Sequence, residues 1–158
     1  MRRSMVEDNA SHAGHLSTLA LYGLSVAATV GVATVTKRPL PGRMRMRDLV
    51  VAAAAAQKLS RTVTKSSVTR PLRAPFAEPV DGGGPGEVAD VPAGKVLRSS
   101  IGELLTCPFC MDVWAISGLT AGRVFAPAAT GVVTDALAAL AGADFLQLAY
   151  ARAQQAAE

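Results

Sequence analysis

Aromatic residues, cysteines and histidines are scarce in this chain of 158 residues. Aromatic side chains make up 4% of it, and it has two cysteines, two histidines and one tryptophan. Two cysteines cannot form a disulfide framework, and the basic stretches lack the interleaved aromatic residues on which nucleic-acid bases stack. The triple glycine at 82–84 is not followed by the Gly-Lys-Ser/Thr ending of a phosphate-binding loop, and no nucleophilic triad is recognisable. These absences favour a protein that is not an enzyme, needs no cofactor and has no nucleic-acid partner.

Hydrophobic residues, in contrast, are plentiful and lie in blocks. They make up 50% of the chain, and most of them are Ala, Val and Leu. Residues 16–35 contain no charge and are long enough to cross the roughly 30 Å hydrocarbon core at about 1.5 Å per residue. Two later blocks predict two further spans, whereas a third block is too short to cross alone. The expected elements are transmembrane helices at 16–36, 100–125 and 128–151, a short helix at 48–60, and a Pro/Gly-rich cytoplasmic loop at 71–96.

The distribution of charge predicts how these helices are oriented. Residues 37–73 hold ten of the sixteen basic residues and a single acid, Asp48. Because basic loops face the cytoplasm, we expect this region inside, the N-terminus outside and the short helix not to cross. The alternative has four spans with both ends inside and exposes the cluster at 43–47 on the outer face. Either order makes residues 1–158 one all-α domain, a helical bundle of about three spans plus one short helix in the first order. We expect a multi-pass protein of the cell membrane, and the Ala, Arg and Gly bias suggests a bacterial inner membrane.

The same charges predict a partner, a bilayer with anionic headgroups. Each basic residue near such a surface contributes about 1 kcal/mol to binding. The candidate lipid-binding residues are Arg43, Arg45, Arg47, Lys58, Arg61, Lys65, Arg70 and Arg73. Small residues at Gly23, Ala27 and Gly31, and a second pair at Gly118 and Gly122, allow close helix contact. A second copy of the chain or another membrane protein is therefore a further expected partner.

The block at 100–125 carries both cysteines and an internal proline. Ser100 followed by Glu103 forms a capping-box pattern that predicts a helix start at Ile101, and Pro108 predicts a kink or a restart of the helix near Thr106.

Cys107 and Cys110 are three residues apart and have the spacing of a thiol–disulfide site. A redox or metal-binding membrane protein is therefore the alternative to a structural or interaction role. Because the negative charge of Glu103 and the apolar neighbours disfavour a thiolate, we expect slow thiols that serve packing.

Further candidates are polar residues near the expected spans. An acidic or basic residue inside a membrane is a candidate functional residue, for example in a proton or cation path. The candidates here are Glu103, Asp112, Arg123 and Asp135. Arg123 is a possible partner of Asp135 across the turn near Pro127. His12 and His15 could complete a zinc site with Cys107 and Cys110. The preferred topology separates the histidines from the cysteines by the membrane, so no metal site is expected. Only the four-span order, or a contact between chains, would allow this site.

Four blocks together resemble one known family. They are KLSRTVTK at 58–65, VTRPLRAPF at 68–76, GELLTCPFC at 102–110 and DFLQLAYAR at 144–152. They are similar to the domain-of-unknown-function 1360 family, a group of small bacterial multi-pass membrane proteins. The resemblance implies a membrane location and no particular mechanism. The chain departs from the family pattern at Gln57, Ser66 and Asp112, so a role that depends on the family's side chains at these positions is not expected here.

Overall fold

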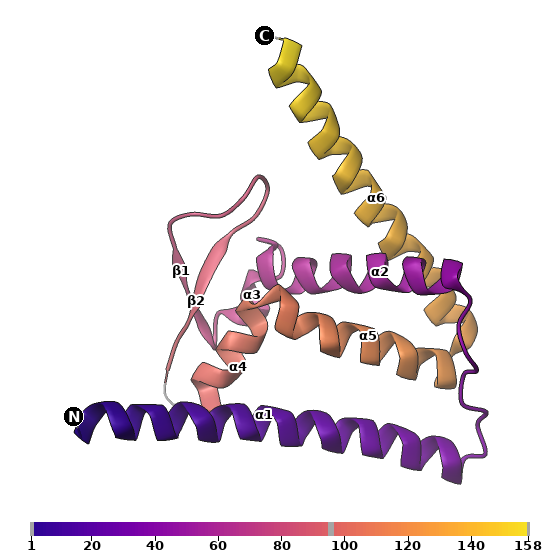
Figure 1. Cartoon of the computed structure of the whole chain (residues 1–158), viewed down its shortest axis with the longest axis horizontal. Coiled ribbons are helices and arrows are strands. Elements are labelled where there is room, and N and C mark those ends of the chain that lie inside the picture. Colours follow the sequence, from indigo (N-terminus) through magenta and orange to yellow (C-terminus); the bar gives the residue numbers. More distant parts are fainter. Residues whose placement is uncertain (1, 95–96, 158) are drawn as a thin grey trace.

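A computed structural model describes residues 2–94 and 97–157 of the chain, with side chains from Gly14 onward. The described part is mostly helical, as the sequence predicts, with one small sheet (Figure 1). The elements in chain order are α1 (Arg2–Val35), α2 (Met46–Lys65), α3 (Arg70–Arg73), β1 (Ala77–Val80), β2 (Ala89–Pro92), α4 (Leu97–Thr106), α5 (Pro108–Phe125) and α6 (Pro127–Ala157).

Two of these helices are long and apolar enough to cross a membrane. They are α1, over Gly14–Val35, and α6. On α1 most large apolar side chains are exposed, and Leu16 and Leu24 are 66% and 68% accessible. α6 begins with Pro127 at its first position, where the missing N–H is not needed. It ends six residues beyond the predicted 151, because the alanine-rich tail continues to favour helix.

The predicted span at 100–125 is broken in two. α4 and α5 meet at 83° with Cys107 between them, so the break expected at Pro108 is present. Pro108 is the first residue of α5, and the Cys107 thiol accepts a hydrogen bond from the Cys110 N–H at 3.3 Å. The predicted start at Ile101 is wrong, since α4 begins at Leu97 and Ser100 lies within it. The bent pair qualifies as a single broken span or as a re-entrant segment.

α2 is longer than the predicted 48–60. It continues to Lys65, and the buried hydroxyls of its second half bond back to the helix. Ser60 donates to the Gln57 carbonyl at 3.0 Å, and Thr64 donates to the Ser60 carbonyl at 2.8 Å. These bonds satisfy the polar atoms that would otherwise oppose burial. A small core forms where Ala55 and Ala56 pack against Ala115 and Leu119 of α5.

The predicted loop at 71–96 contains regular structure. β1 and β2 pair antiparallel, with Ala77 opposite Pro92 and Val80 opposite Ala89. α4 packs against this hairpin at Gly102, where a Cβ would collide with the Phe76 carbonyl oxygen and approach Pro92 Cα at 3.1 Å. The fold is therefore a helical assembly with one hairpin. α4 packs closely against this hairpin because residue 102 has no side chain.

α1 and α5 run in the same direction. The Tyr22 ring meets Trp114 edge-on at 5.4 Å between centroids, and its hydroxyl lies 3.0 Å from Ser117 Oγ. Closer to the N-terminus of α1, and in α4 just before α5, His15 Nε2 is 2.7 Å from Glu103 Oε2. The first turns of α1 and the start of α4–α5 therefore lie at one end of the molecule, together with the hairpin (Figure 1). We call this the hairpin end, and we call the opposite end, with residues 36–45 and Ala126, the linker end.

α2 runs in the opposite direction to α1 and α5. At the linker end Arg123 Nη1 donates to Met44 Sδ at 3.6 Å, and at the hairpin end the C-terminal residues of α2 meet α3. α6 leaves the linker end and crosses α2 before it projects away from the bundle (Figure 1). These directions contradict the expected order, in which the first span and the 100–125 helix run oppositely and α2 does not return between them.

Candidate functional site

The basic region at 37–73 is divided between the two ends of the molecule. Residues 37–47 lie at the linker end, before and at the start of α2, and residues 58–73 lie from the middle of α2 to α3 at the hairpin end. Arg43 and Arg45 are exposed at the linker end, and the exposed Arg47 lies 3.6 Å from Asp48. An exposed pair of this kind contributes little to stability, so these three cations are available to solvent or headgroups.

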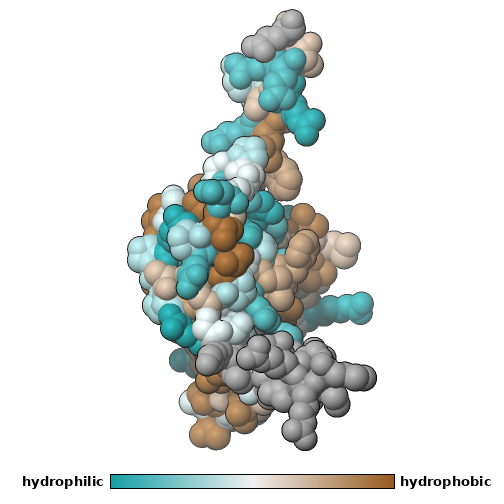
Figure 2. Space-filling view, turned by 90° about the vertical axis from the view of Figure 1, so that its left-hand side faces the viewer, coloured by the Kyte–Doolittle hydropathy of each residue, from teal (hydrophilic) through white to brown (hydrophobic). Residues whose placement is uncertain are grey.

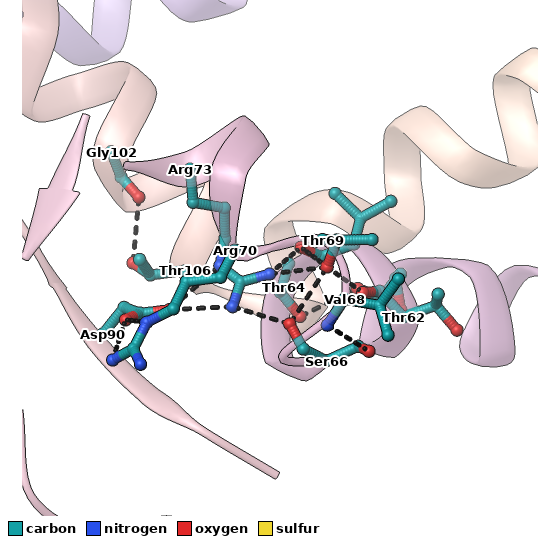
Figure 3. A network of polar contacts seen from close by, with 12 residues as sticks. Thr62, Thr64, Ser66, Val68, Thr69, Arg70, Arg73, Asp90, Gly102 and Thr106 are labelled. Atoms are coloured by element: carbon teal, nitrogen blue, oxygen red, sulfur yellow. Dashed lines mark hydrogen bonds and ion pairs between the residues drawn. The ribbon is translucent and has the colours of Figure 1, made fainter. Parts of the chain in front are cut away.

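Arg73 is not available to headgroups, which corrects its prediction as a lipid-binding residue. Its side chain is 0% exposed and is held on all sides (Figure 3). Nε and Nη2 donate to Asp90 Oδ2 at 3.0 and 2.8 Å. Nη1 donates to Thr69 Oγ1 at 2.7 Å and to the Val63 carbonyl at 2.6 Å. A fully paired guanidinium in this position has a structural role.

The structural role of Arg73 is to end α2. The last carbonyls of a helix lack partners within it, and a nearby cation satisfies them and the negative end of the helix dipole. Arg73 binds the Val63 carbonyl and, through Nη2, the Ser66 carbonyl at 2.9 Å. Arg70 adds a second, more exposed cation, with Nη2 3.1 Å from Asp90 Oδ1. Asp90 of β2 thus ties the hairpin to the C-terminal end of α2.

The remaining three cations of residues 58–73 share one face of α2 and line a groove. Lys58 Nζ is 2.5 Å from Asp144 Oδ2 of α6, and Arg61 is paired with Glu87 of the hairpin turn. Within the described part of the chain, Lys65 has no ion pair. The groove encloses about 680 Å³ between α2, residues 84–87 and α6.

The two cysteines lie at the bend between α4 and α5. Both are free thiols, and their Sγ atoms are 2.7 Å apart. Cys110 is exposed and Cys107 is half-buried. Cys107 caps α5 through its sulfur, so the pair has at least a local structural part. The redox role stays a prediction.

The histidine that the zinc hypothesis uses lies at the same end as the cysteines. His15 contacts Glu103, four residues before Cys107, so the expected separation by the membrane is wrong. His12 lies outside the residues with described side chains. Among the side chains that are described, no three His, Cys, Asp or Glu residues are grouped closely enough to hold a metal ion.

The other polar candidates are dispersed. Asp112 lines a second pocket of about 690 Å³ between α2 and α5, together with Met44, Ala56 and Ile116. Its Oδ1 is buried and has no hydrogen-bond partner among the described residues. Arg123 contacts Met44, and Asp135 is exposed on α6. The Arg123–Asp135 pair that the sequence allows is not found among the described ion pairs.

Of the glycines predicted to allow close helix contact, only Gly122 has a neighbouring helix packed against it in the described structure. A Cβ at Gly122 would lie 2.6 Å from Thr130 Oγ1, so this glycine permits the close approach of α5 and α6. Gly23, Gly31 and Gly118 have open space at the Cβ position. The partner helix expected on α1 stays a prediction.

From the sequence, the acidic loop that holds Asp90 either folds back on the preceding basic segment or is solvated, with the solvated state preferred, and no basic partner is predicted for Asp144. Acids in a Pro/Gly-rich loop are usually solvated, and an acid in an apolar segment gives no sign of its partner.

A protein-family model matches residues 51–150, and the family is described as "Protein of unknown function (DUF1360)". The match spans α2 to α6 and thus includes the groove, the buried Arg73–Asp90 pair and the cysteine bend. No curated protein and no solved structure matches the chain.

Proposed function

Because the chain belongs to this family of unknown function, DUF1360, which assigns no activity, we propose a function from the structure alone. The protein is an integral, multi-pass protein of the bacterial cell membrane without catalytic activity, with a structural or interaction role. Its basic residues contact anionic headgroups. The observation that supports this most is α1, where most large apolar side chains between Leu16 and Val35 are exposed. In water such a surface is unfavourable, whereas lipid chains would cover it.

The directions of the helices support a four-segment topology. If α1 and α5 both cross and run in the same direction, the chain has to return between them, and α2 is the element that returns. α2 is not apolar enough to stand alone in lipid, since only its first half is apolar. The contacts with α5 and α6 shield it: Ser60 and Thr64 are buried, and Lys58 is paired with Asp144.

The hairpin end is proposed to face the cytoplasm. Besides the basic residues of α2 and α3 it holds Arg98, and the chain begins there with Arg2 and Arg3. The linker end holds residues 37–47 and Arg123. The excess of Lys and Arg at the hairpin end favours the inside for this end. Hydrophilic residues cover much of its described surface (Figure 2). Both termini are then inside.

Cysteine accessibility tests this topology. Both native cysteines are replaced by serine, and single cysteines are introduced as Gly42→Cys, Gly83→Cys and Ala156→Cys. A membrane-impermeant maleimide should label position 42 in intact cells, and positions 83 and 156 only in inverted vesicles. Labelling of 42 and 83 from the same side would show that α2 does not return. Extraction of the protein from membranes by carbonate would overturn the integral location itself.

A second candidate function is thiol–disulfide exchange, favoured by the 2.7 Å approach of the two sulfurs and the exposure of Cys110. Two thiols would lose two protons and two electrons to a partner disulfide, which becomes two thiols. The test is alkylation of the protein in membranes across pH 6 to 9. Slow labelling supports the packing role, and rapid labelling at neutral pH or a reversible Cys107–Cys110 disulfide supports exchange.

A further inference from the structure

The groove at the hairpin end has the features of a specific lipid site. We propose that it binds the phosphate headgroup of an anionic phospholipid, with the acyl chains lying along the apolar side of α6. The inference rests on the proposed membrane location, and it assigns one defined site to a contact that is otherwise spread over the surface.

The cations of the groove are arranged for a phosphate. Lys58, Arg61 and Lys65 are three and four residues apart on α2 and all line the groove. Arginine offers a fork of donors and lysine a point charge, and both bind phosphate oxygens. The groove also contains the side chains of Gln57 and Gln147, which add uncharged donors.

The two acids in the groove hold the cations without neutralising all of them. Asp144 binds Lys58 from α6, and Glu87 binds Arg61 from the hairpin turn. Three cations therefore face two carboxylates, and Lys65 is the one without an ion pair in the described structure. An anion that enters the groove meets a net positive charge centred near Lys65.

The walls of the groove favour a lipid over free phosphate. α6 contributes Ala141, Phe145 and Leu148, and the latter two are 65% and 50% exposed. A soluble anion would gain nothing from this wall, whereas an acyl chain would bury it. The apolar wall continues along a helix that is itself a candidate span, so a chain lying there extends into the hydrocarbon. A volume of about 680 Å³ is within the range of about 300–1,000 Å³ for small-ligand pockets.

The groove lies at the depth of a headgroup layer. It is at the hairpin end, where the apolar residues of α2 give way to Lys58, Arg61 and Lys65. The His15–Glu103 contact lies at the same end, where the charge-free run of α1 begins. Phosphates of a bilayer in which α1 spans would therefore be close to the three cations.

Lipid retention by the full-length protein tests the proposal. The purified protein in detergent is titrated with phosphatidylglycerol or phosphatidylcholine, and bound lipid is counted by native mass spectrometry. The wild type should retain phosphatidylglycerol in preference to phosphatidylcholine. Lys65→Gln should weaken this retention about fivefold, the effect of one basic residue at an anionic surface. Leu148→Gln should weaken it by removing the apolar wall. Unchanged thermal unfolding, followed by Trp114 fluorescence, shows that both variants fold.

Arg38→Gln is the matched control, because it removes one exposed cation at the linker end that is not among the candidate lipid-binding residues. It should leave retention within twofold of the wild type. Equal losses in Lys65→Gln and Arg38→Gln would mean diffuse surface attraction, which overturns the groove but not the proposed function. Full competition by millimolar inorganic phosphate, with no effect of Leu148→Gln, would identify a soluble phosphate ligand and overturn the lipid assignment. Absence of the protein from the membrane fraction would instead overturn the proposed function.

Discussion

Asp90 accepts hydrogen bonds from two nitrogens of Arg73, at 3.0 and 2.8 Å, and the two side chains are 3% and 0% exposed. The same guanidinium binds two carbonyls at the end of α2, those of Val63 and Ser66. This pair therefore connects β2 of the hairpin to the C-terminal end of α2. The hairpin carries Glu87 and the turn that closes the groove, so the buried pair also fixes one wall of the proposed lipid site.

Breaking the buried pair should unfold the hairpin end. Arg73→Met leaves Asp90 buried without its cation, and we expect a loss of about 3–5 kcal/mol in the free energy of unfolding. The measurement is a denaturant titration in detergent followed by Trp114 fluorescence. Arg70→Met is the control, since Arg70 is 39% exposed, and should lose less than about 1 kcal/mol. A similar small loss in both variants would contradict a buried pair.

A side chain at Gly102 should force α4 away from the hairpin. Gly102→Ala places a Cβ against the Phe76 carbonyl and Pro92, and we expect a loss of about 1–3 kcal/mol from overpacking. Gly118→Ala is the matched control in a neighbouring helix, because its Cβ meets open space. It should be neutral or gain up to about 1 kcal/mol from helix propensity. Equal thermal stability of the two variants would show that α4 does not pack here as described.

The thiol of Cys107 should matter as a helix cap. Because its sulfur accepts the Cys110 N–H at 3.3 Å, Cys107→Ala should lose about 1 kcal/mol, whereas Cys107→Ser should keep most of the stability. Thermal unfolding of both variants in detergent makes the comparison. Cys110→Ala removes the exposed thiol and should have a smaller effect. If alanine and serine at 107 behave alike, the sulfur does not act as a cap.

Asp112 should be a source of instability. Its Oδ1 is buried without a described partner, beside an apolar pocket, and an unsatisfied buried group costs about 1–3 kcal/mol. Asp112→Leu should therefore raise the free energy of unfolding in detergent. Asp81→Leu, at an exposed position of the hairpin turn, should change it by less than about 0.5 kcal/mol. Loss of stability in Asp112→Leu would mean that the carboxylate has a partner in the membrane-embedded protein.

The sequence was most informative where one residue type decides the local structure. The absence of charge over 16–35 predicted the apolar helix of α1, and Pro108 predicted the break between α4 and α5. The resemblance in four blocks predicted the family, which the family match confirms. For all three, the signal lies within one stretch of the chain.

Features that depend on distant partners could not be predicted in this way. Residues 37–73 were taken as one basic region because a count of charges carries no direction. α2 begins in the first half of this region and ends in the second, and its 20 residues extend about 30 Å. The contact between Tyr22 and Trp114 places α1 and α5 side by side in the same direction, so α2 has to run back between them. The hydrophobic periodicity of a single stretch does not predict a contact between such distant residues. Arg73 was predicted to be a surface cation because its partner Asp90 lies in the second strand of the hairpin that follows it. The strands of this hairpin are only four residues long, so the sequence does not predict them clearly.

In the proposed topology, in which α5 crosses the membrane, the bend at Cys107 would set the thickness of bilayer that the protein can match. Because α4 turns aside by 83°, only the 18 residues of α5 are aligned with α1, and they extend about 27 Å at about 1.5 Å per residue. The 22-residue candidate span of α1 extends about 33 Å at the same rise. A bilayer thick enough for α1 would therefore have to thin around α5 or leave α1 tilted, and such mismatch sorts proteins between membranes. A thin bilayer should suit this chain best, and the bend rather than the longest helix determines that preference.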